Sequence, residues 1–400
     1  MSYRLEKLRQ ILVEEELDAI LISQGENRRY LSGFTGSAGF LLISQDRAIL
    51  AADSRYVEQA QAEAPVFEVV RIQGALSKWL PPLLSGLDIQ RLGFEGRDIS
   101  FLTYKELTGV AAETSGEISL VSTEELVESL RAVKDQAELE CLEKAAAISD
   151  AALEEVLPGV QPGISERELA WELESFMRRN GSEPLPFDII VASGPNSALP
   201  HAKPTNRVIR TNEPVMIDLG ANVGGYFSDI TRTICLGEGD NTFHRIYDIV
   251  LGAQLTAMAT LQVGMNGEQV DQLARTVIAR AGYEENFGHG LGHGVGLAAH
   301  EEPRLGPNSS SVLANGMVFT IEPGIYLVPA IWQNQEVIGP LADCVNRPAV
   351  DALLAAGFGG IRIEDTVHIH PAGTRGPEIL TSDLPTDPDE VAAVVKGNTR

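Results

Sequence analysis

The glycine-rich stretch GHGLGHGVG (288–296) contains two histidines, His289 and His293, that stand four residues apart. On a helix this spacing would put both imidazoles on one face, as in helical zinc-binding motifs. Glycine, however, costs about 1 kcal/mol per helix-interior position relative to alanine, and five of the nine residues are glycine. The stretch therefore predicts an extended segment whose backbone passes close to another group.

Carboxylates form a second group of candidate residues. The segment PVMIDLGANVGGYFSDITRTICLG (214–237) is typical of a β-hairpin. With a turn centred near Val223–Gly224, Asp218 is expected opposite Asp229 on the same face. Directly opposed side chains have Cβ atoms about 5 Å apart, and like charges there are destabilising. Such a pair is tolerated when it shares a proton or holds a cation.

Two further acids follow strand patterns. Glu322 ends the apolar run MVFTI (317–321). In GIRIEDTVHIH (360–370), alternate positions are apolar and the intervening ones are polar, so the two sets lie on opposite faces of a strand. The polar face comprises Arg362, Glu364, Thr366, His368 and His370. This pattern indicates a sheet with one face in the core and the other lining a site.

Taken together, these segments supply four carboxylates and one imidazole. The set comprises Asp218, Asp229, His293, Glu322 and Glu364. An oxygen-rich set of this kind suits a pair of Mn²⁺, Zn²⁺ or Co²⁺ ions better than a single structural zinc. Paired ions activate a water and polarise a carbonyl, so the composition of the cluster indicates two-metal hydrolysis.

The elements that must position these residues separate into two regions. Residues 1–132 alternate helical and apolar strand patterns, which predicts a small α/β domain. Its helical patterns lie at 2–16, 53–64 and 100–112, and its apolar runs at 19–23, 39–44, 48–52, 67–72 and 118–122. A long helical pattern at 135–157 opens the second region. We therefore expect a boundary near 131–134 and a second domain over 133–400.

The second region contains an internal similarity. VQPGISERELAWELESFMRRNG (160–181) aligns without gaps to LQVGMNGEQVDQLARTVIARAG (261–282). In each, a glycine precedes an N-cap residue, Ser165 or Asn266, and an amphipathic helix then ends at glycine. Chance similarity of two helices is the alternative. A true duplication predicts an α+β domain with an internal pseudo-twofold axis and a site between its halves.

Composition restricts the classes of partner. The formal net charge of −25 argues against nucleic acid or an anionic membrane as the main partner. The three cysteines are scattered, and a sparse, odd count fits a reducing compartment. The N-terminus has no signal-like apolar region, and no run approaches the roughly 18 apolar residues of a membrane span. These features predict a cytoplasmic protein.

Four motifs, in order along the chain, are similar to the ligand-bearing segments of the pita-bread metallopeptidases. They are IDLGANVGGYFSDITRT, HGLGHGVGLAAHEEP, FTIEPGIY and GIRIEDTV. The group includes Xaa-Pro dipeptidase (prolidase), aminopeptidase P and methionine aminopeptidase. RRYLSGFTGSAGFLLI (28–43) and RAVKDQAELECLEKAA (131–146) resemble the creatinase-like N-terminal domain and the start of the catalytic domain. Methionine aminopeptidases lack that N-terminal domain, so the resemblance points to the proline-specific branch.

The resemblance implies two divalent ions per subunit. In the family pattern, Asp229 and Glu364 bridge both ions, Asp218 completes one, and His293 and Glu322 complete the other. Histidines at positions like those of His201, His289 and His300 face the substrate, although packed or surface histidines are the ordinary alternative. A homodimer, in which the N-terminal domain contributes to the neighbouring site, is also implied.

Roles in hydrolysis of an Xaa-Pro bond can be assigned on this basis. Glu322 is the expected proton shuttle, and His300 is expected to donate to the developing oxyanion. His201 and His289 would orient the proline side of the substrate. Arg362 is expected to hold a ligand carboxylate in place, its alternative being a surface arginine. Arg375 would bind a substrate carboxylate or else be solvated.

The length of the substrate is the least determined property. An inserted segment at 328–359 separates two ligand strands where the family usually has a short connection. It is interpreted as a lid or rim that limits substrate length, or alternatively as a surface excursion. The insertion favours an Xaa-Pro dipeptidase, with aminopeptidase P as the alternative and a non-catalytic pita-bread binding module as a remote one.

Overall fold

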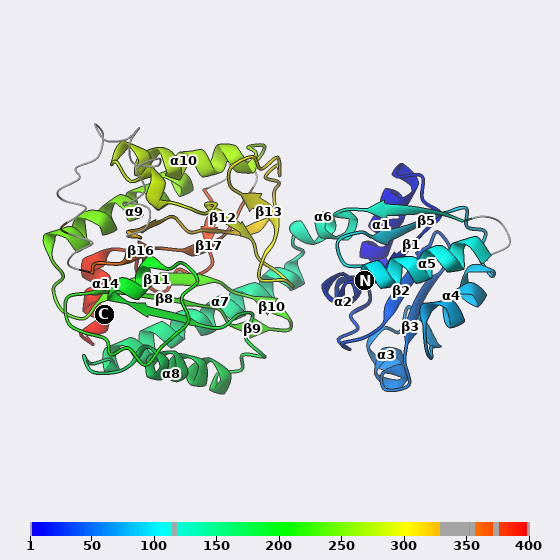
Figure 1. The fold of residues 1–400 in the computed structure, drawn as a ribbon, viewed down its shortest axis with the longest axis horizontal. Coiled ribbons are helices and arrows are strands. Elements are labelled where there is room, and N and C mark those ends of the chain that lie inside the picture. The colour runs from blue at the N-terminus through cyan, green and yellow to red at the C-terminus, as the bar shows by residue number, and fades with distance from the viewer. Residues whose placement is uncertain (1, 114–117, 329–351, 353–356, 371–375, 398–400) are drawn as a thin grey trace. The chain divides into compact units, whose positions relative to one another are not determined.

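The computed structural model describes residues 2–113, 118–328, 352, 357–370 and 376–397. The chain divides into two compact units, an N-terminal unit of residues 1–131 and a C-terminal unit of residues 132–400 (Figure 1). Among the described helices, none is both long and apolar enough to cross a membrane.

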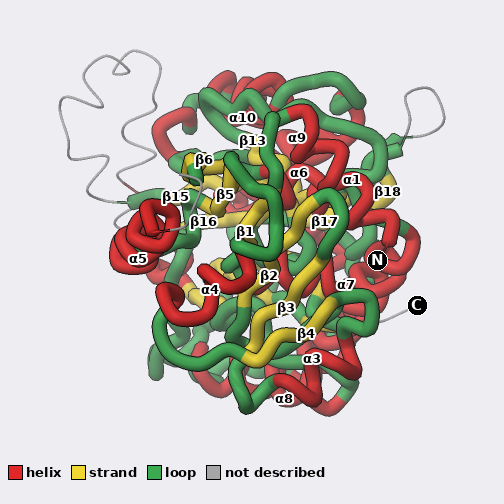
Figure 2. The backbone as a smooth tube through the Cα atoms, turned by 90° about the vertical axis from the view of Figure 1, so that its right-hand side faces the viewer, coloured by secondary structure: helices red, strands yellow, loops and turns green. Residues whose placement is uncertain are grey.

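The N-terminal unit is built on a six-stranded sheet with the strand order β4-β3-β2-β1-β5-β6. Figure 2 shows β1 to β4 side by side. Its strands are β1 (Ala19–Ile22), β2 (Phe40–Ser44), β3 (Ala48–Ala52), β4 (Glu68–Arg71), β5 (Arg91–Glu95) and β6 (Ser119–Thr123). The β1–β2 and β2–β3 pairs are antiparallel, and the other three pairs are parallel. The sheet is therefore mixed, and the predicted α/β class is confirmed.

Six helices accompany this sheet in the described part of the unit. They are α1 (Ser2–Glu14), α2 (Gly25–Ser32), α3 (Val57–Glu63), α4 (Leu76–Leu84), α5 (Phe101–Glu113) and α6 (Leu126–Ala132). The sequence patterns predicted α1, α3 and α5, but not α2, α4 or α6. The sequence pattern missed α4 because it contains two prolines, Pro81 and Pro82, and proline normally ends a helix. The fully buried Leu80 of α4 nevertheless packs in the same core as Leu21 and Leu92 of the sheet.

The C-terminal unit has two halves, each with two long helices and a sheet. The first half contains α7 (Gln136–Val156), α8 (Glu166–Arg179), β7 (Ile190–Ser193), β8 (Pro214–Leu219), β9 (Asn222–Val223), β10 (Tyr226–Phe227) and β11 (Ile230–Cys235). The second half contains α9 (Asn241–Thr260), α10 (Gly267–Arg280), β12 (Gly292–Gly294), β13 (Glu301–Leu305), β14 (Val318–Ile321), β15 (Gly324–Tyr326), β16 (Gly360–Arg362), β17 (Asp365–His368) and β18 (Glu378–Ile379). A final helix, α14 (Pro388–Val395), follows. In Figure 1 the strands lie between the pair α7 and α8 and the pair α9 and α10.

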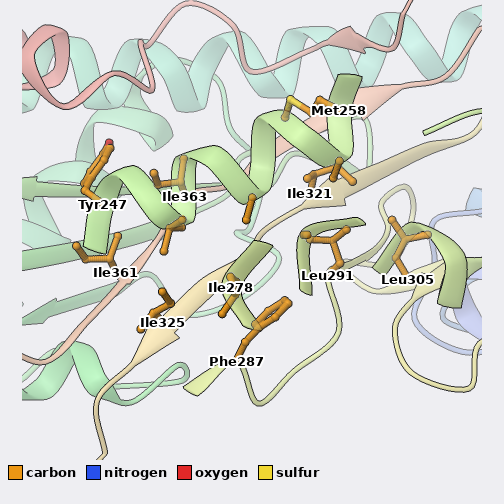
Figure 3. Packing of buried hydrophobic residues seen from close by; sticks show 14 of the residues in the cluster. Tyr247, Met258, Ile278, Phe287, Leu291, Leu305, Ile321, Ile325, Ile361 and Ile363 are labelled. Carbon is orange, nitrogen blue, oxygen red and sulfur yellow. The ribbon is translucent and has the colours of Figure 1, made fainter. Parts of the chain in front are cut away.

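The strands form a β11-β8-β7 sheet in the first half and a β13-β12-β14-β17-β18 sheet in the second. An antiparallel bridge between Thr231 and Glu364 connects the two. Apolar residues of α9 and α10, such as Tyr247 and Ile278, pack against Ile321, Ile361 and other strand residues (Figure 3). A separate cluster joins α7 and α8 to β7, β8 and β11. Each sheet therefore has one face covered by its own helix pair.

The internal similarity is confirmed by contacts that recur in both halves. Ser165 and Asn266 each form a capping box, with Glu168 and Gln269 as the reciprocal partners. Before each helix, the N–H of Gly163 donates to Ile209 and that of Gly264 donates to Leu313. Ser165 bridges to Val208, and Asn266 bridges to Val312. The predicted α+β fold with a duplicated unit therefore holds for the C-terminal unit.

Candidate active site

The β-hairpin that contains Asp218 and Asp229 is present, but its predicted register is wrong. The turn falls at Gly224–Gly225, where both residues have positive φ (60° and 83°), as a two-residue type I′ turn requires. Asp218 therefore pairs with Thr231 and not with Asp229. Asp229 lies two residues before Thr231, so alternation places it on the same face as a diagonal neighbour of Asp218.

The glycine-rich segment is extended around His293, as predicted. Its residues Gly292 to Gly294 form β12, which pairs with both β13 and β14. A Cβ on Gly292 would lie 2.0 Å from the carbonyl oxygen of Thr320, and one on Gly294 would lie 2.1 Å from that of Glu302. The glycines are thus required because β12 is confined between two strands, and this confinement fixes the position of His293.

His293 faces the carboxylates through Nε2. This atom lies 3.3 Å from Glu322 Oε1 and 3.8 Å from Asp229 Oδ2. Nδ1 lies 3.1 Å from the carbonyl oxygen of Gly294, so Nδ1 carries the proton that is donated to it. This contact leaves Nε2 facing the carboxylates, where it donates to Glu322 when the ring is protonated and would present its lone pair to a metal ion.

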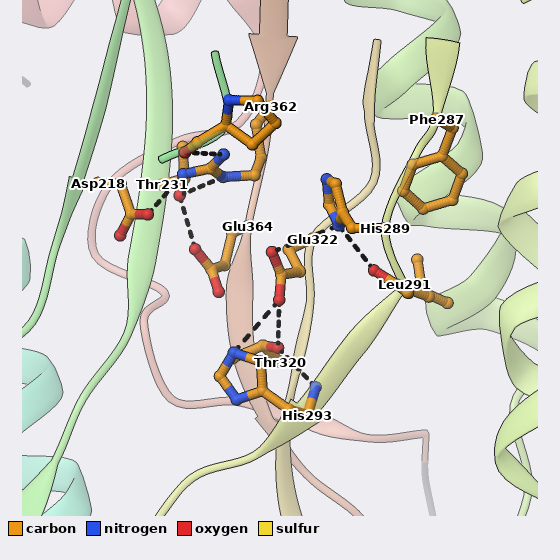
Figure 4. Close-up of polar contacts among 12 residues, drawn as sticks. Asp218, Thr231, Phe287, His289, Leu291, His293, Thr320, Glu322, Arg362 and Glu364 are labelled. Carbon is orange, nitrogen blue, oxygen red and sulfur yellow. Dashed lines mark hydrogen bonds and ion pairs between the residues drawn. The ribbon is translucent and has the colours of Figure 1, made fainter. Parts of the chain in front are cut away.

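Arg362 and Thr231 hold the other carboxylates (Figure 4). Arg362 donates to Asp218 at 2.5 Å and to the hydroxyl of Thr231 at 3.0 Å. Thr231 in turn donates to Glu364 Oε2 at 2.6 Å. Asp218, Asp229, Arg362 and Glu364 are all less than 10% exposed. The five predicted ligands and Arg362 therefore form one buried cluster, assembled from both halves.

The carboxylates of the cluster have too little positive charge around them to stabilise all of their ionised forms. Burial, and then the charges of Glu364 and Asp218, raise the pKa of Asp229 well above its usual value. Burial, with Glu322 and Asp218, does the same to the pKa of Glu364. Burial also acts to raise the pKa of Glu322, but the hydrogen bond and charge of His293 outweigh it and lower that pKa to about 2. The crowding disfavours four ionised carboxylates unless a cation joins them.

The residues fit a pair of divalent ions. Asp229, His293 and Glu364 each offer a ligand atom within 4.8 Å of the others. Oδ1 of Asp218 is buried and has no hydrogen-bond partner among the described residues, and a bare buried carboxylate oxygen is costly without a counter-charge. Four oxygen donors and one imidazole are a hard donor set of the kind that Mn²⁺ and related ions accept.

The three other predicted histidines surround this cluster. His300 is an exposed residue, and its ring lies against that of His293, with centroids 4.1 Å apart and an interplanar angle of 42°. His201 is also exposed, and its charge acts on both His289 and His300. Burial lowers the pKa of His289, and burial followed by the charge of His293 lowers the pKa of His300. Both rings therefore favour the neutral form at neutral pH.

Tyr326 is a site residue that the sequence reasoning missed. Arg362 donates to its hydroxyl at 2.9 Å, and that hydroxyl lies 2.9 Å from Nε2 of His289. Because Nδ1 of His289 donates to the carbonyl of Gly290 at 2.8 Å, Nε2 is the acceptor from Tyr326. Both ring nitrogens of His289 are thus engaged, which leaves its ring face and edge for a ligand. The motif FTIEPGIY contains Tyr326, but nothing in its spacing indicated this contact.

Two buried acids that fix nearby loops were also missed. Asp271 pairs with Arg275 at 2.6 Å and accepts from the N–H of Leu291. Arg275 donates to the carbonyls of Phe287 and His289. In the sequence, Asp271 and Arg275 have the spacing of an ordinary surface pair on a helix, so the pattern gave no sign of a role in the site.

Glu166, at the first position of α8, is the second of these acids. It is fully buried and accepts hydrogen bonds from Ser193, Asn196 and Thr205. These contacts enclose the segment that contains His201. Two other predictions lie outside the described residues: Arg375, and all of the 328–359 insertion except residues 328, 352 and 357–359.

Comparison with known proteins defines the class of this site. Residues 140–371 match metallopeptidase family M24, and residues 4–133 match the creatinase/prolidase N-terminal domain. The chain belongs to metallopeptidase family M24, whose members use divalent metal ions. The predicted family and the predicted pita-bread fold are confirmed.

Individual relatives extend over nearly the whole chain. The chain is 35% identical to the Xaa-Pro dipeptidase of Pyrococcus furiosus, over 94% of this chain and 97% of that one. Its fold matches the Xaa-Pro dipeptidase from Bacillus anthracis with a TM-score of 0.83 and 39% identity, over 95% of this chain and 97% of the other. It also matches the X-Pro aminopeptidase from Thermotoga maritima, with a TM-score of 0.80, 35% identity and coverage of 96% and 98%.

Proposed function

We propose that this protein hydrolyses the bond between an N-terminal residue and proline, with dipeptides as its preferred substrates. The observation that carries the proposal is the buried cluster of four carboxylates and His293, whose raised pKa values at Asp229 and Glu364 indicate a site built for cations. The Xaa-Pro dipeptidases among the relatives, similar over nearly the whole chain, support the choice of substrate class.

Five residues would hold the two divalent ions: Asp218, Asp229, His293, Glu322 and Glu364. Bound there, the ions would supply an activated water and polarise the scissile carbonyl. Asp229 and Glu364 lie where both halves meet, and together with His293 they would hold metal. Asp218 belongs to the first half, while His293 and Glu322 belong to the second, so both halves would contribute to holding the ions.

The protein's own groups would then move the protons. Glu322 would accept a proton from the attacking water. It would pass this proton to the leaving proline nitrogen. Arg362 is a positioning residue, because its Nη2 donates to Asp218 while its Nε and Nη1 donate to the hydroxyls of Thr231 and Tyr326.

The histidines would recognise the substrate. His300 and His201 are exposed beside the cluster, so their ring nitrogens can reach a bound peptide. His300 would donate to the oxyanion that develops on the scissile carbonyl. His201 would contact the proline side. His289, whose nitrogens are both engaged, would offer its ring face to the proline ring. Arg375 remains a proposed partner for the carboxylate of a dipeptide.

Aminopeptidase P activity is the second candidate. It is favoured by the similarity to the X-Pro aminopeptidase from Thermotoga maritima, at 35% identity over 96% of this chain. A dipeptidase must bind both ends of its substrate, whereas an aminopeptidase leaves the carboxyl side open. The two activities therefore differ in what the protein provides beyond the proline.

The deciding experiment measures hydrolysis of Ala-Pro and Ala-Pro-Ala side by side, after chelation and readdition of Mn²⁺, Zn²⁺ or Co²⁺. Cleavage of Ala-Pro alone is the expected result. Cleavage of Ala-Pro-Ala would instead establish an aminopeptidase. Cleavage of neither under any metal would contradict the proposal and favour a binding module. The same assay identifies the metal that supports the highest activity, for which we propose Mn²⁺ or Zn²⁺.

Two further properties belong to this proposal. A homodimer is proposed on the family resemblance, and sedimentation of the purified protein would test it. A cytoplasmic location is proposed from the sparse cysteines and the charge of −25. Fractionation of cells that express the full chain would check it.

A further inference from the structure

A second group of metal-ligating side chains lies at the β17–β18 edge. The register of these two strands places His368 directly opposite Glu378. His370 follows two residues after His368, where the alternation of an extended chain returns to the same side. Opposed residues in an antiparallel pair have Cβ atoms about 5 Å apart. Three side chains from two segments of the chain therefore meet on one side of the sheet.

Their distances bring ligand atoms close together. Nε2 of His370 lies 2.8 Å from Oε2 of Glu378, and Nδ1 of His368 lies 3.9 Å from the same oxygen. The two imidazole centroids are 4.4 Å apart. One ligand atom from each residue lies within 4.8 Å of the other two. Donors around a tetrahedral ion with bonds of about 2.1 Å sit roughly 3.4 Å apart, so small rotations bring all three onto one ion.

The histidine side chains are shielded but reachable. They are 12% and 16% exposed, and that of Glu378 is 42% exposed. An ion arriving from solvent can therefore reach the cluster while losing most of its water to protein ligands. The cluster is separate from the candidate active site, because His368 stands four residues beyond Glu364, or about 13 Å along an extended chain.

We propose that His368, His370 and Glu378 form a third metal site, selective for Zn²⁺, Co²⁺, Ni²⁺ or Cu²⁺. Two imidazoles and one carboxylate are a donor set used for zinc, and imidazole suits these ions whereas carboxylates suit manganese. Mn²⁺ should therefore fill the four-carboxylate cluster but bind the two-histidine cluster too weakly to survive dialysis. Metal choice thus separates the two sites.

An ion at this site would fasten β18 to β17. The ladder between them consists of two residue pairs, which is a short contact for an edge strand. β17 begins at Asp365, immediately after Glu364. The third ion is therefore a structural clamp on the strand that follows a catalytic ligand, and it takes no part in the reaction.

Metal analysis of the whole protein tests the proposal. After chelation and dialysis against excess Zn²⁺ or Mn²⁺, the wild type should retain three zinc ions per chain but two manganese ions. His370→Gln and Glu378→Gln should each retain two zinc ions and keep Mn²⁺-dependent activity. His244→Gln is the matched control, since His244 of α9 contacts the carbonyl of Glu238 and neither cluster. This control should retain three.

Two outcomes would overturn the assignment. If the wild type holds no more zinc than Glu378→Gln, the three residues form only hydrogen bonds. If both variants keep the third zinc, it binds elsewhere. Zinc anomalous diffraction from a crystal of the wild type gives an independent reading, because the proposal requires a peak about 2.1 Å from a ring nitrogen of His368. The counts do not depend on which peptide the enzyme cleaves.

Discussion

Glu166 of the first half and Asp271 of the second half perform comparable tasks with different chemistry. Glu166 accepts hydrogen bonds from neutral donors and so holds the segment around His201. Asp271 forms an ion pair with Arg275, and together they hold the segment around His289. The two acids do not occupy equivalent positions in their helices: Glu166 is the first residue of α8, whereas Asp271 is the fifth of α10.

The frame around these acids is nevertheless the same in both halves. The capping boxes of α8 and α10 and the backbone hydrogen bonds before each helix recur. Backbone contacts tolerate a change of side chain, so a duplicated frame persists while its loops diverge. The capping boxes and backbone contacts are therefore repeated in the two halves, but the ligand residues are not. Each half supplies different ligands to a single cluster.

The largest expected effect tests whether both halves are needed. Asp229→Asn in the first half and His293→Ala in the second should each lower kcat/KM about 10³-fold or more. Metal ions contribute several kcal/mol to such reactions, and each 1.4 kcal/mol is tenfold. After loading with Mn²⁺, bound metal should fall below two ions per chain in each variant. Asp188→Asn, which alters an exposed carboxylate, is the control. Full activity in either ligand variant would mean that one half suffices.

A second difference between the halves lies in their long helices. Asp150 of α7 and Gln254 of α9 are both buried near Asp365. Only the acid titrates, and burial raises its pKa to about 7. The folded state therefore favours protonated Asp150. Its stabilising contribution is complete below about pH 4 and is lost as the pH rises through 7, a loss of about 4 kcal/mol in the free energy of unfolding.

Urea unfolding of the wild type and Asp150→Asn between pH 5 and 8 checks this pH dependence. The variant should lose less stability than the wild type as the pH rises. Asp248→Asn, an exposed change on α9, should follow the wild type. Parallel curves for the wild type and Asp150→Asn would show that Asp150 has an ordinary pKa.

The two loop-holding acids should differ in energetic effect. Asp271→Ala leaves the mostly buried charge of Arg275 unpaired and should cost about 3 kcal/mol of stability. Glu166→Ala leaves neutral donors unsatisfied and should cost about 2 kcal/mol. Chemical denaturation measures both, with Glu268→Ala, an exposed change on α10, as the control. A larger loss for Glu166→Ala would reverse the comparison.

Arg362 connects the halves, since it contacts Asp218 and Pro200 of the first and Tyr326 of the second. Lysine retains the charge but not the fork of donors. Arg362→Lys should therefore lower metal affinity or activity 10- to 100-fold, the usual range for residues that orient a ligand. Metal titration and peptide hydrolysis measure this effect. A variant with wild-type values would show that charge alone is sufficient.

The smallest effect probes the repeated frame itself. Ser165→Ala and Asn266→Ala each remove a capping box and should each cost about 1 kcal/mol. Equal losses in urea unfolding are expected if the halves are energetically equivalent at these positions. If the two losses in the free energy of unfolding differ by more than about 1 kcal/mol, the halves share geometry but not energetics. Activity should stay unchanged in both variants.

The sequence alone determined the features that depend on neighbouring residues. Helix caps, apolar alternation and glycine content are local, so they predicted α7, α8, α10 and the extended segment at His293. The ligand types and their order were likewise visible, because carboxylates and an imidazole in these strand patterns have few alternative uses. Short or proline-containing helices such as α4 were missed, since their local signals conflict with helix formation.

Only the tertiary structure decided how distant segments meet. A two-residue turn at Gly224–Gly225 placed Thr231, rather than Asp229, opposite Asp218. The bridge from Thr231 to Glu364 spans the two halves, and so do the contacts from Arg362 through Tyr326 to His289. Such pairings depend on how two separately packed sheets align. Local sequence does not encode that alignment, because burial of both sheets and satisfaction of their polar groups select it together.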